Sequence, residues 1–305
     1  MSFPKRITKA YWLTHKRFPL PKVITFDAYN TLYCTLVPVM EQYSIEARKC
    51  GINVPAETLT SRFPGVFKAL KERHPNYGKY SGLTADQWWS TLIKDLFHGT
   101  NPSDTLVHNI LKRFEGKQAY AVYPDVIQFL QLLKTQHPEI VVGIISNTDP
   151  NVYRLLENLG LLDYFQGHTY FSFELEVSKP DVKIFDGVLR DIMKTRPTLF
   201  PKGSTIADAR QWCWHIGDEM KNDMLGAKNA GWNSVLIDRL NLHEYLNDRT
   251  ASPKQISEHE ISIQKVDQTM SKIWEFCKAK EDSIQLDNTT FVIPNISCFE
   301  HFFFE

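Results

Sequence analysis

The sequence predicts an α/β protein with a doubly wound parallel sheet and an inserted helical segment. Apolar, strand-like runs alternate with helical patterns over residues 120–238, as a parallel sheet covered on both faces requires. The apolar, β-branched stretch 22–27 predicts one more buried strand near the N-terminus. Between about residues 36 and 118, apolar residues recur at helical spacing and no alternating strand pattern is present. Because parallel sheets bind ligands at the carboxyl ends of their strands, we expect the functional residues there.

The composition is that of an ordinary globular protein. The 305 residues are 43% hydrophobic and 23% charged, and the formal net charge is zero. This balance does not indicate nucleic-acid binding, and no run of 18 apolar residues predicts a membrane span. The five cysteines are widely spaced and include no C-x-x-C pair. That pattern favours a reducing, intracellular compartment over a disulfide framework or a structural zinc site.

The N-terminal segment is strongly basic. Residues 1–26 contain six Lys or Arg side chains, and the first acidic residue is Asp27. Basic leaders without acids are typical of mitochondrial targeting segments. The alternative is that residues 1–21 form a basic arm leading into the first strand of a cytoplasmic protein. Pro19 and Pro21 limit any helix to about the first 18 residues.

The inserted segment contains four predicted helices. Thr84 followed by Gln87 forms the sequence pattern of a capping box, and Ser103 is a suitable N-cap for the last helix. Pro64 is expected near the start of the second helix, because proline disrupts a helix interior. The four predicted helices span residues 38–51, 61–75, 83–99 and 103–116.

The remaining elements build the predicted sheet domain. We expect helices at 123–138, 149–161, 179–193 and 220–232, strands at 139–147, 168–173, 212–218 and 233–238, and a loop at 195–211. The predicted division is a core of residues 22–35 and 119–305 with a helical insertion at 36–118. A C-terminal extension begins at about residue 240.

The C-terminal extension contains few periodic patterns. Residues 264–280 are compatible with one helix, and the last strand of the sheet is expected at 233–238. The phenylalanine-rich end, residues 296–305, is expected to be packed, because exposed phenylalanines would favour aggregation.

Polar residues stand at the ends of four predicted strands or directly after them. Each is unremarkable alone, since an Asp after a strand is usually a turn or cap residue. Four such positions after successive strands would meet at one edge of the sheet. These residues are Asp27, Ser146 with Asn147, Lys179, and Asp218 with Asn222 and Asp223.

At these positions the chain resembles the haloacid dehalogenase (HAD) superfamily. The matching motifs are FDAYNTL (26–32), SNTDP (146–150), SKPD (178–181) and GDEMKND (217–223). Residues 74–89 and 215–232 resemble the branch of the haloacid dehalogenase-like hydrolase domain-containing protein 3 and the rhythmically expressed gene 2 protein. The resemblance implies a Rossmann-like core and makes the helical insertion a cap domain.

The resemblance also implies a phosphatase mechanism. Asp27 would be the nucleophile that forms an aspartyl phosphate, Ser146 would donate to the phosphoryl group, and Lys179 would supply positive charge. Mg²⁺ would neutralise the approaching anions, with a small phosphorylated molecule as substrate. Thr31 and Asn147 would be phosphate-binding groups. The implied metal ligands are Asp27, the carbonyl of Tyr29, Asp218 and Asp223.

One position departs from the pattern of these phosphatases. They carry an acid–base Asp two residues after the nucleophile, where this chain has Tyr29. A tyrosine with an ordinary pKa near 10 is a poor base at neutral pH, and loss of a general acid–base removes roughly 10² to 10⁴ in rate. Good leaving groups, such as acyl or nitrophenyl phosphates, would be affected least.

Two other functions compete with a slow phosphatase. One is a binding or scaffold protein with little turnover, for which a protein partner would be expected. The other is a metal-independent 2-haloacid dehalogenase, which the DAY-x-TL pattern also resembles. Those enzymes use an arginine of the cap to hold the substrate carboxylate. In this chain the corresponding position is Thr58, and Arg62 lies only nearby in the sequence. Their tyrosine after the lysine is Phe185 here, and the acid-rich GDEMKND motif suits a cation better.

Three conspicuous residues are expected to have structural roles. Trp88 and Trp89 are expected in the core of the helical insertion. His215 lies inside a predicted strand and is expected to be packed there.

Overall fold

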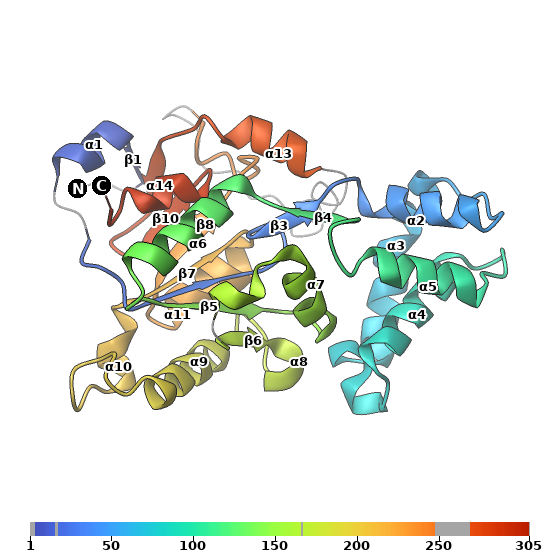
Figure 1. Ribbon diagram of the computed structural model, residues 1–305, viewed down its shortest axis with the longest axis horizontal. Coiled ribbons are helices and arrows are strands. Elements are labelled where there is room, and N and C mark those ends of the chain that lie inside the picture. Colours follow the sequence, from blue (N-terminus) through green and yellow to red (C-terminus); the bar gives the residue numbers. More distant parts are fainter. Residues whose placement is uncertain (1–3, 16–17, 166, 248–268, 305) are drawn as a thin grey trace.

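The computed structural model describes residues 4–15, 18–165, 167–247 and 269–304. Within them, one eight-stranded sheet has the strand order β1-β9-β10-β8-β7-β2-β5-β6 (Figure 1). The six strands from β10 to β6 are parallel, and β9 pairs antiparallel with both β10 and β1. The strands are β1 (Lys5–Ile7), β2 (Val23–Phe26), β5 (Val141–Ser146), β6 (Thr169–Phe171), β7 (Cys213–Gly217), β8 (Asn233–Ile237), β9 (Ser283–Gln285) and β10 (Thr290–Ile293). The predicted α/β class and parallel sheet are confirmed.

The central strands are apolar because both of their faces are covered. Every residue of β2 is buried, and the same holds for β7 and β8. Phe26 pairs with Ile144 on one side and with Ile216 on the other. This register aligns the carboxyl ends of β2, β5 and β7 at one edge, which is where the predicted polar residues follow.

Two helical layers enclose the sheet. On one face, α6, α7 and α14 share a hydrophobic cluster with β2, which includes Phe129, Leu156 and Phe299. On the other face, α9 and α11 pack against β2 and β5 through residues such as Phe185 and Ala227. These helices are α6 (Pro124–Gln136), α7 (Asn151–Leu159), α9 (Val182–Thr195), α11 (Gly226–Asn229) and α14 (Ile296–Glu300). Short one-turn segments are η2 (Leu162–Tyr164) and α8 (Ser172–Leu175).

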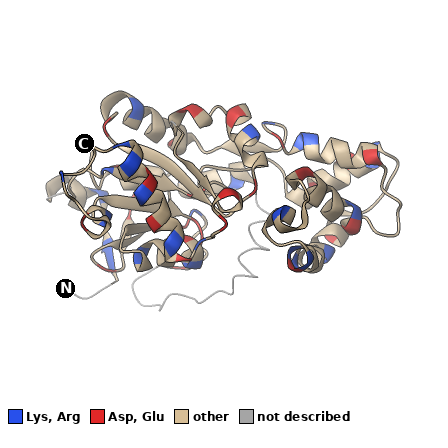
Figure 2. Cartoon of the chain, turned by 90° about the horizontal axis from the view of Figure 1, so that it is seen from below, with Lys and Arg blue, Asp and Glu red and all other residues tan. Residues whose placement is uncertain are grey.

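The segment between β3 and β4 is helical, as predicted. β3 (Tyr33–Thr35) and β4 (Tyr120–Val122) pair antiparallel and lead into and out of it. Its helices enclose a hydrophobic cluster of their own and lie to one side of the sheet (Figure 1). Lys, Arg, Asp and Glu are interspersed along them (Figure 2). The helices are α2 (Val39–Lys49), α3 (Ala56–Arg73), η1 (Asn76–Ser81), α4 (Ala85–Leu96) and α5 (Asp104–Arg113).

Helix starts in this segment follow the sequence signals with one exception. The capping box of Thr84 and Gln87 is present, and Ser103 caps α5. The prediction that the second helix starts near Pro64 is wrong. The helix α3 begins at Ala56, directly after Pro55, whose backbone is extended, and it contains Pro64 in its interior. The apolar spacing before Pro64 was too sparse to indicate a helix, and only Leu59 is buried in that half.

Three further expectations in the core need correction. The predicted loop 195–211 contains a short helix, α10 (Ile206–Arg210). Thr205 and Asp208 form a capping box that stabilises the start of this helix. The predicted helix 220–232 begins as one π-helical segment, η3 (Met220–Leu225), before α11. β8 is not the last strand, because β9 and β10 extend the sheet beyond it. These strands are only three and four residues long, which is too short for an alternating pattern to be recognised.

The two ends of the described chain pack together. The helix α13 (Met270–Cys277) occupies part of the predicted 264–280 helix, of which 264–268 lie outside the described residues. The phenylalanine-rich end is buried, as predicted. The ring of Phe302 lies tilted against Trp12 of α1 (Lys9–Thr14), with ring centroids 4.8 Å apart. Figure 1 shows the N-terminal and C-terminal segments side by side. Within the described residues, no helix has the length and apolar character that a membrane span needs.

Replacing Trp12 by Ala should destabilise the whole fold, because Trp12 is 4% exposed and its indole N–H donates to Ser283 Oγ at 3.3 Å. We expect the free energy of unfolding to fall by about 3–5 kcal/mol, the usual cost of a large aromatic-to-alanine change in a core. Urea denaturation measures it. The matched control is Leu13→Ala, since Leu13 is 61% exposed and should change stability by no more than about 0.5 kcal/mol. If Trp12→Ala lowered the free energy of unfolding as little as Leu13→Ala is expected to, this segment would not contribute to the core.

Candidate active site

Asp27 lies at the carboxyl end of β2. Its backbone N–H donates to Ile216 O at 2.8 Å, which continues the β2–β7 pairing by one residue. The following loop turns sharply at Asn30, whose φ of 59° is left-handed and suits Asn better than most residues. The Asp27 side chain is 13% exposed, so the carboxylate is partly accessible at the edge of the sheet.

Lys179 connects two of the predicted carboxylates. Its Nζ lies 2.6 Å from Asp27 Oδ1 and 2.6 Å from Asp223 Oδ1. Burial alone would lower the pKa of Lys179, but the charges of Asp223 and Asp27 outweigh it and the pKa is raised. Lys179 therefore stays charged at neutral pH and holds both carboxylates.

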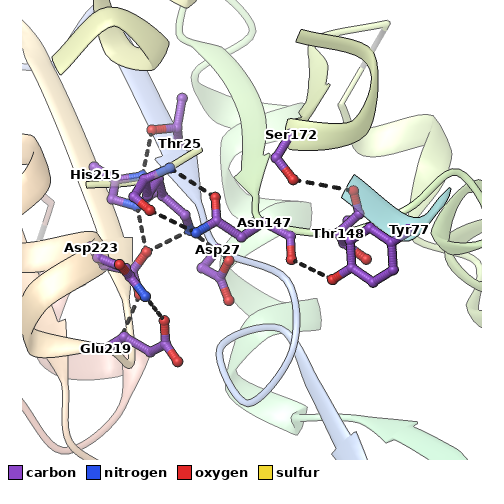
Figure 3. Close-up of polar contacts among 11 residues, drawn as sticks. Thr25, Asp27, Tyr77, Asn147, Thr148, Ser172, His215, Glu219 and Asp223 are labelled. Atoms are coloured by element: carbon purple, nitrogen blue, oxygen red, sulfur yellow. Dashed lines mark hydrogen bonds and ion pairs between the residues drawn. The ribbon is translucent and has the colours of Figure 1, made fainter. Parts of the chain in front are cut away.

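A hydrogen-bonded chain behind Asp223 fixes its orientation (Figure 3). Thr25 Oγ1 lies 2.9 Å from His215 Nδ1, and His215 Nε2 lies 3.1 Å from Asp223 Oδ1. Burial lowers the pKa of His215, so its ring is neutral at pH 7. Burial would raise the pKa of Asp223, but Lys179 and His215 lower it below its ordinary value. An ionised Asp223 needs a donor, so His215 donates from Nε2 and accepts the Thr25 hydroxyl at Nδ1.

Gly217 makes room for Asp223. A Cβ at position 217 would lie 2.1 Å from Asp223 Cγ, a distance at which atoms cannot coexist. The second Asp223 oxygen, Oδ2, accepts the N–H of Glu219 at 2.9 Å. The motif GDEMKND therefore requires glycine at position 217 for a steric reason, because the buried Asp223 carboxylate lies too close to the backbone for any side chain there.

Asp27, Asp218 and Asp223 form a candidate metal centre. One carboxylate oxygen from each lies within 4.8 Å of the others, and all three residues are buried or nearly so. Lys179 is the ammonium that bridges two of these carboxylates, those of Asp27 and Asp223. A cluster of carboxylate oxygens is the kind of ligand set that suits a hard divalent cation such as Mg²⁺.

Of the remaining predicted residues, Asn147 contacts this centre through Lys179. Asn147 uses both ends of its amide on the backbone of Lys179, at 2.9 Å to its carbonyl and 2.8 Å from its N–H. This contact positions the lysine. Ser146 is buried as the last residue of β5. Thr31 Oγ1 is buried without a hydrogen-bond partner among the described residues, while its carbonyl accepts from Arg239 Nη2 at 3.2 Å.

The Tyr29 side chain lies beside the site and packs against other aromatic rings. Its ring packs edge-on against Tyr120, with centroids 6.2 Å apart. Burial raises the pKa of the Tyr29 hydroxyl far above its ordinary value near 10. Its side chain therefore cannot serve as a base at neutral pH.

The helical segment reaches the site through two residues for which the sequence predicted no contact with the core. The Tyr77 hydroxyl of η1 donates to Asn147 O at 3.2 Å (Figure 3), and Trp89 Nε1 of α4 donates to Asp149 Oδ2 at 2.9 Å. Trp88 is buried in the helical cluster as expected, and Trp89 is partly buried against the same cluster while its Nε1 reaches Asp149 of the core. Adjacent helical residues point about 100° apart, which was the available signal that the two tryptophans have different surroundings.

The fold and site together define a Rossmann-like α/β protein with a lysine–carboxylate centre at the carboxyl edge of its sheet. The chain belongs to the haloacid dehalogenase-like hydrolases, which match residues 21–231. It is 46% identical to the uncharacterized protein YMR130W of Saccharomyces cerevisiae, over 99% of this chain and all of that protein. It is 27% identical to the human haloacid dehalogenase-like hydrolase domain-containing protein 3, over 71% of this chain and 81% of that protein. The predicted family and branch are confirmed.

Two solved structures share the fold. The defluorinating L-2-haloacid dehalogenase Rha0230 has a TM-score of 0.52 at 14% identity, over 85% of this chain and 99% of that chain. The HAD-hydrolase YfnB from Bacillus subtilis bound to magnesium has a TM-score of 0.50 at 15% identity, over 73% and 91%. At these identities the similarity shows the fold alone.

Proposed function

We propose that this hydrolase is a Mg²⁺-dependent phosphatase that acts through an aspartyl phosphate on Asp27. The observation that carries the proposal is the group of three carboxylates around one buried lysine. Asp27, Asp218 and Asp223 would hold the metal together with the carbonyl of Tyr29. The metal would neutralise charge on the phosphoryl oxygens. A magnesium-bound relative of the same fold, YfnB, supports this assignment.

The side chains of this protein would carry out the steps that the metal does not. Asp27 attacks phosphorus while the bond to the leaving oxygen breaks, and that oxygen keeps the electron pair. Lys179, fixed by Asn147, offsets the negative charge that accumulates. Ser146 and Thr31 would donate hydroxyls to the phosphoryl group. Water then attacks phosphorus and releases phosphate from Asp27.

Tyr29 makes this enzyme slow toward poor leaving groups. No proton donor is available at position 29, so the leaving oxygen must depart without one. We assign residues 36–118 as the cap over a core of residues 22–35 and 119–305. The cap residues Tyr77 and Trp89 already contact the loop after β5.

A second candidate function is ligand binding without turnover, which the raised pKa and burial of Tyr29 favour. The dehalogenase alternative is less compatible with the geometry. A metal-independent reaction would use Asp27 as the nucleophile but leaves the clustering of Asp218 and Asp223 beside it unexplained. Arg62, moreover, donates to Leu96 O at 3.0 Å within the helical segment.

Hydrolysis of acetyl phosphate, a small substrate with a good leaving group, should depend on Mg²⁺. We expect EDTA to abolish it and Mg²⁺ to restore it, and Asp218→Asn should raise the Mg²⁺ concentration for half-maximal activity about tenfold or more, because one ligand loses its charge. Kinetic assays across a Mg²⁺ titration measure both effects. Asp163→Asn, at an exposed position, is the matched control. Full activity in EDTA would refute the metal assignment, and metal-independent halide release from 2-chloropropionate would establish a dehalogenase.

A further inference from the structure

A large cavity lies between the helical segment and the core. Its volume is about 680 Å³, within the range of small-molecule sites. Eight of its 22 lining residues are Tyr, Phe or Trp. Those used below are Tyr29, Tyr33, Phe63, Trp89, Phe114 and Tyr120. Such a wall favours a flat, apolar ligand.

The cavity adjoins the reacting residues. Tyr29 lies two positions after Asp27, and Thr148 and Asp149 directly follow Asn147. Tyr33 of the wall packs beside Tyr29, with ring centroids 6.1 Å apart, and Tyr77 of the wall donates to Asn147 O at 3.2 Å. A phosphoryl group at Asp27 would therefore place its leaving group in the cavity.

The charges of the wall disfavour an anionic leaving group. Its two cations, Lys112 and Arg154, both pair with Glu115, at 2.6 Å and 2.5 Å. The other two carboxylates of the wall are Asp86, which accepts from Asn151 at 2.8 Å, and Asp149, which accepts from Trp89. Three carboxylates against two cations leave no excess positive charge to bind a second anionic group.

Tyr29 links the cavity to the chemistry. In place of an acid, position 29 carries a ring that packs on Tyr120 in the wall. A phenolate, with a conjugate pKa of about 10, leaves far more readily without a proton than an alkoxide. Tyr29 therefore favours an aromatic leaving group in two ways: its ring can contact that group, and it provides no general acid for a leaving group that needs a proton.

We propose that the substrate class is small aryl phosphomonoesters whose aromatic body is uncharged or cationic, an inference that rests on the proposed function. Asp27 forms the bond to phosphorus, and the bond from phosphorus to the aryl oxygen breaks. The aryloxide leaves with the electron pair and takes a proton from solvent. Water then hydrolyses the aspartyl phosphate.

The test compares phenyl phosphate with cyclohexyl phosphate and 4-carboxyphenyl phosphate, using acetyl phosphate as the reporter of the basic chemistry. We expect kcat/KM for phenyl phosphate to exceed that for cyclohexyl phosphate at least 100-fold. The value for 4-carboxyphenyl phosphate should be at least tenfold below that for phenyl phosphate. Comparable values for the phenyl and 4-carboxyphenyl esters would overturn the charge argument.

Intrinsic reactivity also favours aryl esters, so variants are needed to show that the cavity contributes. Phe114→Ala and, independently, Phe63→Ala should lower the ratio of phenyl to acetyl phosphate activity about tenfold, because each removes apolar wall. Phe276→Ala, at an exposed position of α13, is the control and should not change the ratio. An unchanged ratio in both folded cavity variants would overturn the proposal.

Binding separates this inference from the proposed function. By calorimetry with Mg²⁺ present, phenylphosphonate should bind at least tenfold more tightly than methylphosphonate, and Phe114→Ala should remove the difference. If no substrate is hydrolysed but this preference holds, the phosphatase proposal fails and the aryl ligand class stands. If acetyl phosphate is hydrolysed but neither aryl preference is found, the aryl proposal fails and the phosphatase stands.

Discussion

Asp27→Asn should lower Mg²⁺-dependent hydrolysis of acetyl phosphate by about 10⁴-fold or more, in line with the loss on removing other catalytic nucleophiles. The amide cannot form an acyl phosphate, it is a weaker metal ligand, and it loses the charge that pairs with Lys179 at 2.6 Å. Steady-state rates at saturating Mg²⁺ measure the loss. The Asp27 side chain is partly exposed, so the variant should stay folded, and its unfolding curve checks this.

The same experiment can detect the intermediate. Acid quenching during turnover should trap a phosphoryl group on the peptide that contains Asp27 in the wild type and not in Asp27→Asn. Asp163→Asn, an amide substitution at an exposed site, should retain both activity and adduct. A variant Asp27→Asn that remains active, or an adduct on another residue, would rule out Asp27 as the nucleophile.

Tyr29→Asp should raise kcat toward an alkyl phosphate such as cyclohexyl phosphate by about 10² to 10⁴, the contribution of a positioned general acid–base. The new carboxyl would stand among aromatic rings near Asp27, where burial favours its protonated form and makes it a proton donor. Acetyl phosphate should gain much less, because its leaving group needs no proton. Parallel kinetics on the two substrates measure the difference.

Tyr29→Phe is the matched control, since it keeps the ring and removes only the hydroxyl. We expect it to behave like the wild type on both substrates, because burial keeps the Tyr29 hydroxyl protonated. A gain in Tyr29→Asp with an inactive wild type would favour a binding protein whose site is disabled at this position. No gain on alkyl phosphates in a folded Tyr29→Asp would show that proton transfer is not what limits this site.

The sequence predicted the elements whose signals are local and strong. β2, β5 and β7 are buried on both faces, so their apolar runs end clearly at Asp27, Asn147 and Asp218. It failed where the signal was short or conflicting. α10 has only five residues, β9 only three, and Pro64 contradicts the helix that contains it.

Side-chain roles were harder to predict than strand ends. His215 was expected to be packed, and it is fully buried, but its position between Thr25 and Asp223 requires the pairing of β2 with β7. Asn147 was expected to bind phosphate, a prediction that still stands, while the structure shows its amide on the backbone of Lys179.

The sequence by itself determined the family, the order of the parallel strands β2, β5, β6, β7 and β8, and the absence of an acid at position 29, because these depend on residue identity and local periodicity. Only the tertiary structure decided that Lys179 bridges Asp27 and Asp223, which lie 152 and 44 positions away in the chain. Only the packing of the helical segment on the core created the aromatic cavity beside Tyr29. Contacts between residues so far apart depend on how whole elements pack, and local sequence patterns carry no record of that packing.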